Sequence, residues 1–194
     1  MKKAKLIAIT GGIGAGKSVV SSILRTAGYG VYDCDQRARE LMNTLPSIKD
    51  ALLERFSPEI YIDGELNRKL LSDIIFNDPE ALTFVNNVVH PQVRKDIIQW
   101  FSNQERDTSF VETAILKEGG IDKMVDIVWN VTAPLETRVK RVMARNGIPR
   151  ENVIERINSQ QTELDYDRDK IVEIINDGTI ALLPQIFQAL NKQS

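Results

Sequence analysis

The stretch that decides the fold lies near the start of the chain and reads LIAITGGIGAGKS, from Leu6 to Ser18. It opens with apolar and β-branched residues, which are typical of a short strand covered on both faces. Residues 11–18 then satisfy the pattern Gly-x-x-x-x-Gly-Lys-Ser, which binds phosphate when a strand precedes it and a helix follows. Apolar residues at helical spacing do follow, and Gly28 is placed to end that helix. The sequence therefore predicts a strand, a phosphate-binding loop and a helix, in that order.

The residue types of this loop suit the binding of a nucleoside triphosphate. Glycine permits backbone conformations that aim successive N–H groups into one hollow, and the start of the following helix adds a partial positive charge. Lys17 would bring its ammonium to the β and γ phosphates, and Ser18 would offer its hydroxyl to Mg²⁺, which takes few protein ligands. The nucleotide contacts expected here are Gly12, Ile13, Gly14, Ala15, Gly16, Lys17, Ser18 and Val19, with Ser18 as the metal ligand.

Short apolar runs recur along the chain and alternate with longer stretches of helical spacing. After residues 6–10, strands are expected at residues 30–34, 109–113, 127–132 and 171–175. Such alternation is typical of α/β proteins whose parallel sheet is covered by helices on both faces. We therefore expect an α/β fold of three layers around a parallel five-stranded sheet.

A long segment separates the second and third expected strands. It runs from about residue 36 to residue 107, which is too long for a plain crossover, so it must contain structure of its own. We expect residues 36–107 to form a helical lobe inserted into a nucleotide-binding core. That core would comprise residues 1–35, 108–140 and 170–194.

Helix signals fill the expected lobe. Apolar residues at helical spacing cover residues 48–56 and 70–75, on either side of an Asp63-Gly64 turn. Asp78-Pro79 has the form of an N-cap followed by proline at the first helical position, and His90-Pro91 is expected to open the next helix.

Basic residues gather after the fourth expected strand. Pro134 would begin a helix there, and Gly147 and Pro149 could bracket a hinge. We expect residues 141–169 to form a lid whose arginines neutralise charge on the phosphoryl group during transfer. The candidates are Arg141, Arg145, Arg150 and Arg156. The alternative is a solvated helix face that carries charge pairs four residues apart.

Two aspartates stand where the second expected strand ends. Asp33 and Asp35 would lie at the sheet edge on which ligands bind, and alternation along the strand would put both on one side. A carboxylate there could accept the proton of an acceptor hydroxyl or hold a metal-bound water beside the γ-phosphate. The alternative for each aspartate is capping of a helix that begins at this point. Cys34, between them, is expected to be a small buried residue.

The composition argues against several classes of protein. With 25 basic and 27 acidic side chains the net charge is −2, so no general field favours nucleic acid or an anionic membrane as a partner. No apolar run approaches the roughly 20 residues that span a bilayer. Cys34 is the only cysteine, so no disulfide can form within the chain, which fits a reducing compartment and hence a cytoplasmic location.

The loop alone does not separate a kinase from other proteins that bind nucleoside triphosphates. A GTPase would need an internal Asn-Lys-x-Asp and an Asp-x-x-Gly after the third strand, and the sequence contains neither. A motor ATPase would end a central strand with an acidic residue, and Glu112 keeps that interpretation open. One core, one lobe and one basic segment account for nearly all residues of the chain. These parts fit a small-molecule kinase, and this argues against a motor ATPase. The rival outside the enzymes is a nucleotide-dependent binding module.

A series of short motifs runs in order through nearly the whole chain. They are residues 10–18, residues 31–35 with 38–40, residues 66–70 with 75–76, Asn87, His90-Pro91, residues 114–118, Arg141, Arg145, residues 156–160 and residues 176–178. This series resembles the dephospho-coenzyme A kinase family. The resemblance implies a P-loop kinase fold with a core, an acceptor-binding helical lobe and a lid. It also implies transfer of phosphate from ATP, with Mg²⁺, to the ribose 3′-hydroxyl of dephospho-coenzyme A.

The resemblance also implies roles for individual residues. Asp35 would be the catalytic base, with Lys17 and Arg145 acting on the phosphates, and Asn176 would belong to the adenine pocket. The expected acceptor-binding residues are Asp33, Arg68, His90 and Glu118. For His90, packing of a lone histidine at a helix start is the favoured alternative.

Two segments depart from the family pattern. The usual Pro-Leu-Leu-Phe-Glu is Ala114-Ile115-Leu116-Lys117-Glu118 here, and the usual Ala-Asp before the last strand is Lys170-Ile171. A kinase of another small acceptor, such as a nucleoside monophosphate or shikimate, is the alternative within the enzymes.

Overall fold

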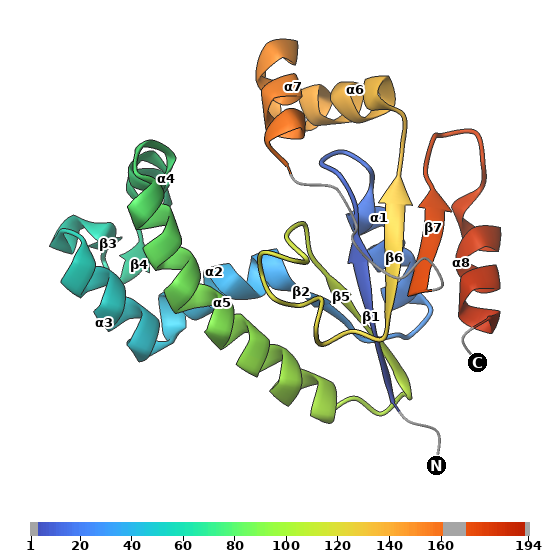
Figure 1. Ribbon diagram of the computed structural model, residues 1–194, viewed down its shortest axis with the longest axis horizontal. Coiled ribbons are helices and arrows are strands. Elements are labelled where there is room, and N and C mark those ends of the chain that lie inside the picture. Colours follow the sequence, from blue (N-terminus) through green and yellow to red (C-terminus); the bar gives the residue numbers. More distant parts are fainter. Residues whose placement is uncertain (1–3, 161–169, 193–194) are drawn as a thin grey trace. The chain divides into compact units, whose positions relative to one another are not determined.

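The chain contains an α/β unit and a helical unit, which Figure 1 shows as ribbons. The computed structural model describes residues 4–160 and 170–192. The two compact units are residues 1–32 with 104–194, called the core unit here, and residues 33–103, called the lobe. None of the helices within the described ranges is both long and apolar enough to cross a bilayer.

A five-stranded parallel sheet forms the centre of the core unit. Its strands, in spatial order, are β2 (Val31–Asp33), β5 (Thr108–Glu112), β1 (Lys5–Thr10), β6 (Ile127–Thr132) and β7 (Ile171–Ile175). β1 is central, with Ile7 opposite Phe110 on one side and opposite Ile127 on the other. The sheet confirms the five strands expected from the sequence. They could be predicted because each is a short apolar run bounded by polar residues or glycine.

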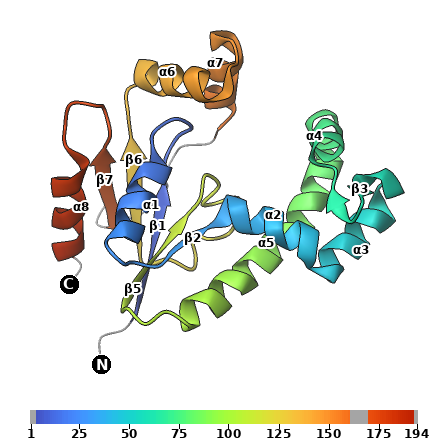
Figure 2. The ribbon, with the colours of Figure 1, turned by 180° about the vertical axis from the view of Figure 1, so that it is seen from behind.

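Helices pack against this sheet and lie beyond one of its ends. The helices of the core unit are α1 (Lys17–Thr26), α6 (Leu135–Asn146), α7 (Arg150–Ser159) and α8 (Leu182–Asn191). Leu24 of α1 and Ile186 of α8 share one buried cluster with Phe110 and Trp129, whose rings meet edge to face at 5.0 Å. In both views α6 and α7 lie beyond the carboxyl end of β6 (Figures 1 and 2). The cluster therefore holds β1 firmly at the point where the glycine loop begins.

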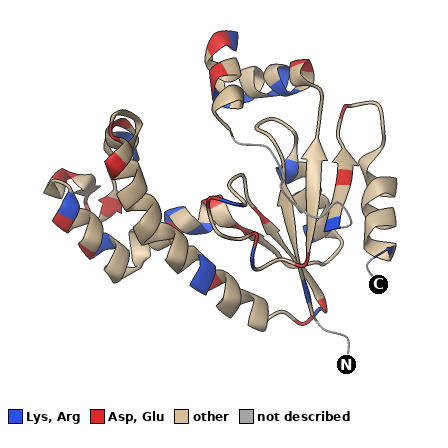
Figure 3. Ribbon diagram, viewed as in Figure 1, with Lys and Arg blue, Asp and Glu red and all other residues tan. Residues whose placement is uncertain are grey.

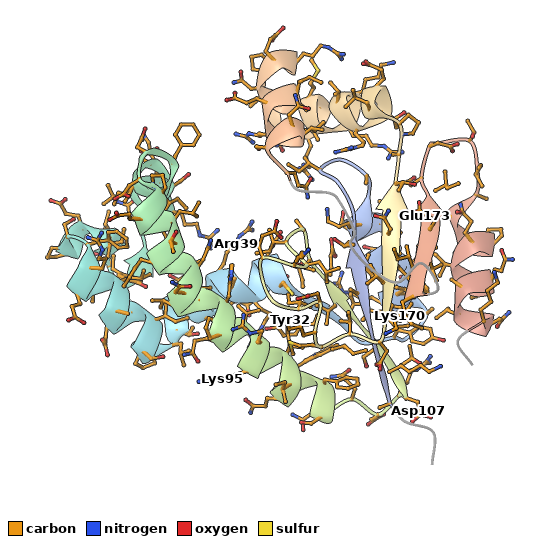
Figure 4. The ribbon with its side chains drawn as sticks, in the orientation of Figure 1. Tyr32, Arg39, Lys95, Asp107, Lys170 and Glu173 are labelled. Atoms are coloured by element: carbon orange, nitrogen blue, oxygen red, sulfur yellow. The ribbon has the colours of Figure 1, made fainter. Side chains whose placement is uncertain are left out.

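The last strand leads directly into a candidate site residue. Asn130 on β6 donates at 2.9 Å to Glu173, its cross-strand partner on β7, which is labelled in Figure 4. Lys170, one of the positions that departs from the family pattern, lies just before β7. After β7, the N–H of Asn176 donates at 2.8 Å to the carbonyl of Thr132. The β6–β7 pairing thus fixes the backbone at Asn176.

The lobe consists of helices and one short hairpin. Its elements are α2 (Cys34–Thr44), α3 (Pro46–Arg55), a 3₁₀ turn η1 (Pro58–Ile60), β3 (Tyr61–Ile62), β4 (Glu65–Leu66), α4 (Arg68–Asn77) and α5 (Pro79–Ser102). Asp63 and Gly64 both have positive φ, 51° and 83°. Two such residues form the type I′ turn that closes a tight hairpin. The Asp-Gly pair predicts this turn, but the two strands are too short to show a sequence pattern.

An ion pair joins α2 to α5 within the lobe. Arg37 donates from Nε and Nη2 to the two carboxylate oxygens of Asp96, at 2.9 and 2.8 Å, and from Nη1 to Glu40 at 2.6 Å. Hydrogen bonds from Gln36 and Arg37 hold the pKa of Glu40 below its ordinary value. A planar guanidinium that grips a carboxylate with two parallel bonds fixes orientation as well as distance. The pair therefore orients α2, the helix that carries Asp35.

The helix start predicted at His90-Pro91 is wrong. α5 runs through both residues, with Pro91 in its interior and His90 half-buried in the middle of the helix. Proline removes one helical hydrogen bond. Buried residues nevertheless recur every four positions on both sides of it, at Ala81, Val85, Val89, Val93 and Ile97. Burial of this continuous apolar face outweighs the missing bond. Asp78 does cap the helix as expected, because its side chain accepts from the N–H groups of Glu80 and Ala81.

Candidate phosphate-binding site

The glycine loop joins β1 to α1 and depends on left-handed backbone conformations. Gly11, Gly14 and Gly16 have φ of 141°, 80° and 100°. Other residues adopt such values only with strain, which explains the glycines of the pattern. The N–H of Ala15 donates at 3.0 Å to the carbonyl of Gly12 and closes a turn with Ile13 and Gly14 at its corners.

The carbonyls of this turn are bonded to side chains from distant parts of the core unit. Arg138 donates from Nε to the Ile13 carbonyl at 2.8 Å, and Asn176 donates from Nδ2 to the Ala15 carbonyl at 2.8 Å. Arg141 reaches the carbonyls of Gly14 and Ala15 from Nη1, both at 3.4 Å. The carbonyls of Ile13 and Ala15 share peptide planes with the N–H groups of Gly14 and Gly16. Because the C=O and N–H of one planar peptide point in opposite directions, these two N–H groups point away from the arginine and asparagine side chains.

The start of α1 completes an arrangement suited to phosphate. Gly16 is the N-cap and no side chain caps the first N–H groups, so the helix N-terminus keeps its affinity for anions. Lys17 lies in the first turn, and its Nζ donates at 2.9 Å to the carbonyl of Gly11. The ammonium is thereby held over the loop. Ser18 and Val19 follow and are exposed.

Arg138 and Gln160 belong to this arrangement although the sequence analysis assigned neither of them a role. The N–H of Ile13 donates at 2.7 Å to Oε1 of Gln160, whose Nε2 donates at 3.2 Å to the carbonyl of Ala114. Gln160 ends one of the family motifs, at residues 156–160, which was the only signal that could have drawn attention to it. Arg138 looks like any basic residue on a polar helix face.

The predicted end of the second strand is wrong, and with it the geometry expected of the two aspartates. β2 stops at Asp33 and α2 begins at Cys34. Oδ1 of Asp33 accepts at 3.0 Å from the N–H of Gln36, so Asp33 caps α2. Asp35 lies exposed in the first turn of that helix. Strand alternation therefore does not relate the two side chains, because a helix begins between them. Cys34 is buried, as expected.

The arginines expected in a lid have different surroundings. Figure 3 shows acidic as well as basic residues on α6 and α7. Arg150 donates to both carboxylate oxygens of Glu136, at 2.9 and 2.6 Å, which joins the two helices. Arg145, exposed in the last turn of α6, donates from Nε to Asn146 at 3.0 Å. Among the residues that the structure describes, Arg141 is the only expected lid arginine that donates a hydrogen bond to the loop. Residues 161–169 of the expected lid lie outside those residues.

The remaining candidates fall in both units. Asn176 is buried beside the loop in the core unit, and Glu118 is exposed between β5 and β6. Arg68 is the first residue of α4 and is exposed, while His90 lies within α5; both belong to the lobe. The core unit therefore brings residues 11–18 together with Asn176.

A parallel sheet whose central strand leads through a glycine loop into a helix defines the P-loop fold of proteins that bind nucleoside triphosphates. A family model described as Dephospho-CoA kinase matches residues 5–181. The chain belongs to the dephospho-CoA kinase family.

Individual relatives agree with this assignment. A dephospho-CoA kinase of Porphyromonas gingivalis is 43% identical over 185 residues, which cover 95% of this chain and 92% of the relative. The crystal structure of TT1252 from Thermus thermophilus is 37% identical, with a TM-score of 0.81, and the match covers 99% of this chain and 97% of that one. The dephospho-CoA kinase from Campylobacter jejuni, 22% identical with a TM-score of 0.66, shares the fold over 97% of this chain and 96% of that one.

Proposed function

We propose that this chain transfers the γ-phosphoryl group of ATP to the ribose 3′-hydroxyl of dephospho-coenzyme A, giving coenzyme A and ADP. The observation that carries the proposal is the geometry of the phosphate loop. Its carbonyls accept hydrogen bonds from Arg138, Arg141 and Asn176, so the N–H groups of Gly14 and Gly16 point away from these side chains and are placed to bind phosphate. Membership of the dephospho-CoA kinase family supports both the donor and the acceptor.

The loop would bind the triphosphate through backbone N–H groups and the uncapped start of α1. Lys17 would exchange its bond to the Gly11 carbonyl for the β and γ phosphates, because a phosphate oxygen carries more charge than a carbonyl oxygen. We propose that Arg145 adds a further positive charge at the phosphates, and that Asn176 contributes to the adenine pocket.

Transfer forms a bond between the acceptor oxygen and the γ-phosphorus and breaks the bond from that phosphorus to the oxygen that bridges the β and γ phosphates. ADP leaves with that bridging oxygen, and the acceptor hydroxyl loses its proton. We propose that the carboxylate of Asp35 accepts this proton or orients the hydroxyl. A largely dissociative transition state needs little basicity, so positioning would be the larger part of its contribution.

Ser18 fits a magnesium ion. Its exposed hydroxyl directly follows Lys17 in the first turn of α1. Residues 4–160 and 170–192 contain no group of three or more His, Cys, Asp or Glu side chains that could hold a metal. That suits an ion whose other ligands are phosphate oxygens and water. When bound there, Mg²⁺ would neutralise charge on the β and γ phosphates.

The other regions have proposed roles in the same reaction. Residues 36–107 would bind the acceptor, with Arg68 and His90 among the contacts. Asp33 and, from the core unit, Glu118 are proposed as further acceptor contacts. Residues 141–169 would act as the lid. A cytoplasmic location fits the single buried thiol.

A coupled assay of ADP release across several acceptors tests the activity. We expect turnover with dephospho-coenzyme A and only background release with nucleoside monophosphates, shikimate or pantothenate. The product, analysed by ³¹P NMR, should carry a new 3′-phosphomonoester. Turnover on a nucleoside monophosphate or shikimate instead would assign the chain to another acceptor class. ATP binding without turnover on any acceptor would identify a binding module.

A further inference from the structure

The corner residue of the phosphate loop, Ile13, is held at three points by the region of α6 and α7. Its N–H donates to Gln160 at 2.7 Å, and its carbonyl accepts from Arg138 at 2.8 Å. Its side chain packs against the small buried cluster that joins the two helices, whose members include Val142 and Val153. The turn itself uses only the Gly12 carbonyl and the Ala15 N–H, so both polar groups of Ile13 depend on these outside partners.

Gln160 joins two loops at the same edge of the sheet. Its carboxamide accepts from Ile13, which follows β1, and donates to the carbonyl of Ala114, which follows β5. Both contacts are to backbone atoms, so the second does not depend on which side chain stands at position 114. The departure from the family pattern at Ala114 therefore leaves this bridge intact.

Arg138 approaches the loop closely enough to limit its composition. A Cβ added at Gly12 would overlap the Arg138 guanidinium, and one added at Gly14 would lie 2.7 Å from the Arg138 carbonyl. Within the described residues, Nη2 of Arg138 is buried without a hydrogen-bond partner. In solvent the guanidinium could satisfy more of its N–H donors than it does here. Packing and the bond to Ile13 therefore hold it in this position.

We propose that Gln160 and Arg138 are positioning residues that fix the Ile13 corner, so that nucleotide phosphate is bound by the N–H groups of Gly14, of Gly16 and of the first turn of α1. The Ile13 N–H stays on Gln160 when nucleotide is bound, which removes it from the expected phosphate contacts. This inference rests on the proposed function, because it assigns the two residues their part in phosphoryl transfer. An opposite arrangement, in which Gln160 only occupies the N–H until phosphate displaces it, predicts effects of opposite sign.

The test compares Gln160→Met, Arg138→Met and the double variant with Ser159→Ala. Ser159 is the neighbour of Gln160, and among the residues that the structure describes its hydroxyl bonds only within α7, to the Arg156 carbonyl. We measure ADP affinity by calorimetry without acceptor, then kcat and the KM of each substrate. Thermal unfolding is followed in parallel, and Gln160→Ala is the second variant if the methionine does not fold.

Each single methionine variant should lower kcat/KM for ATP by roughly 10- to 100-fold and weaken ADP binding, while the KM for dephospho-coenzyme A changes less than about twofold. The double variant should lose far less than the product of the two single losses, because both residues hold one peptide. Arg138→Lys, which keeps a donor in reach of the carbonyl, should lose less than Arg138→Met. Ser159→Ala should behave as the wild type.

Tighter ADP binding by Gln160→Met would show that Gln160 merely occupies the Ile13 N–H until phosphate displaces it, and would overturn the proposal. Unchanged ADP affinity with unchanged kcat, or strictly additive losses, would overturn it as well. The result is separable from the proposed function, since wild-type turnover of dephospho-coenzyme A tests the reaction and acceptor-free ADP binding tests the loop.

Discussion

Asn176 donates a hydrogen bond from its side-chain nitrogen to the carbonyl of Ala15 at 2.8 Å, across 161 positions of sequence. Its oxygen accepts from Arg141 at 3.3 Å, and Arg141 in turn reaches Gly14 and Ala15. The residue after β7 therefore helps to set the loop after β1. A contact of Asn176 with adenine stays a prediction, but a part in shaping the phosphate loop follows from these distances.

Gly16→Ala should abolish most activity because the position has no room for a methyl group. The added Cβ would overlap Nδ2 of Asn176, and φ of 100° strains any L side chain. We expect kcat/KM to fall more than about 100-fold and the free energy of unfolding to drop by roughly 1–3 kcal/mol. Steady-state kinetics and urea denaturation measure the two effects.

The matched control is Gly64→Ala in the hairpin turn of the lobe. Gly64 has φ of 83° and no atom within 4 Å of an added Cβ. It should cost only the backbone strain, about 1 kcal/mol, and leave the KM for ATP unchanged. Equal kinetic losses in the two variants would point to general destabilisation and would contradict a local effect of the contact with Asn176.

Lys17→Ala should remove the charge that neutralises the β and γ phosphates. We expect kcat/KM for ATP to fall by about 100- to 1,000-fold with little change in the melting temperature. Lys49→Ala is the control, because Lys49 also donates from Nζ to a glycine carbonyl, that of Gly64 at 3.1 Å, but does so in the lobe. A loss in Lys49→Ala as large as that in Lys17→Ala would point to general destabilisation.

The sheet was predictable because its information is local. Each strand of the core unit is a short apolar run, and the glycine loop predicts both the strand before it, β1, and the helix after it, α1. The start of α2 was not predictable in the same way. Residues 32–35 read Tyr, Asp, Cys and Asp, an alternation that fits a strand, whereas in the structure a helix begins at Cys34 and the N–H of Gln36 donates to Asp33. Pro91 misled for the converse reason, since burial of one long face overrides its local effect.

The site was predictable where it consists of consecutive residues and unpredictable where it depends on tertiary contacts. Residues 11–18 form a pattern that any reader of sequences can find. Arg138 and Gln160 bond to Ile13 across 125 and 147 positions, and the sequence indicates neither contact, although Gln160 does end a family motif. Their roles depend on the packing of α6 against α7, which only the folded chain shows.

The ion pair between Glu136 and Arg150 should make a small contribution to the stability of the packed helices α6 and α7, and this contribution should be lost in acid. The hydrogen bond from Arg150 is the main cause that holds the pKa of Glu136 below its ordinary value of 4.5, and charge attraction from Arg150 and Lys140 adds to it. A carboxylate with a lowered pKa stabilises the fold above its unfolded pKa and loses that effect as pH falls through the lowered value. The melting temperature of Glu136→Gln should therefore lie below that of wild type at pH 7, and the difference should shrink toward pH 3.

Both side chains of this pair are exposed, so the difference should be small and should also shrink in 1 M NaCl. Arg150→Met should show the same pH profile as Glu136→Gln, because either change removes the same interaction. A difference that grows on acidification would contradict the assignment.

Asp35→Asn should separate chemistry from nucleotide binding. The substitution keeps the size of the side chain and removes the charge that would accept or orient the acceptor hydroxyl, so kcat should fall by about 100-fold or more. ATP affinity should stay within about twofold of wild type, since the phosphate loop belongs to the core unit and Asp35 to the lobe. Isothermal titration with a non-hydrolysable ATP analogue and an ADP-release assay measure the two quantities.

Asp33→Asn is the control that tests whether capping alone explains such a loss. Asparagine caps helices about as well as aspartate, so α2 should keep its start and its stability. If Asp33 also contacts the acceptor through its charge, Asp33→Asn should raise the KM for dephospho-coenzyme A and leave kcat nearly intact, because that contact would be equally strong in the ground and transition states. Turnover by Asp35→Asn at the wild-type rate would remove Asp35 from the mechanism. The acceptor hydroxyl would then lose its proton to solvent, and catalysis would rest on the loop, Lys17 and the arginines alone.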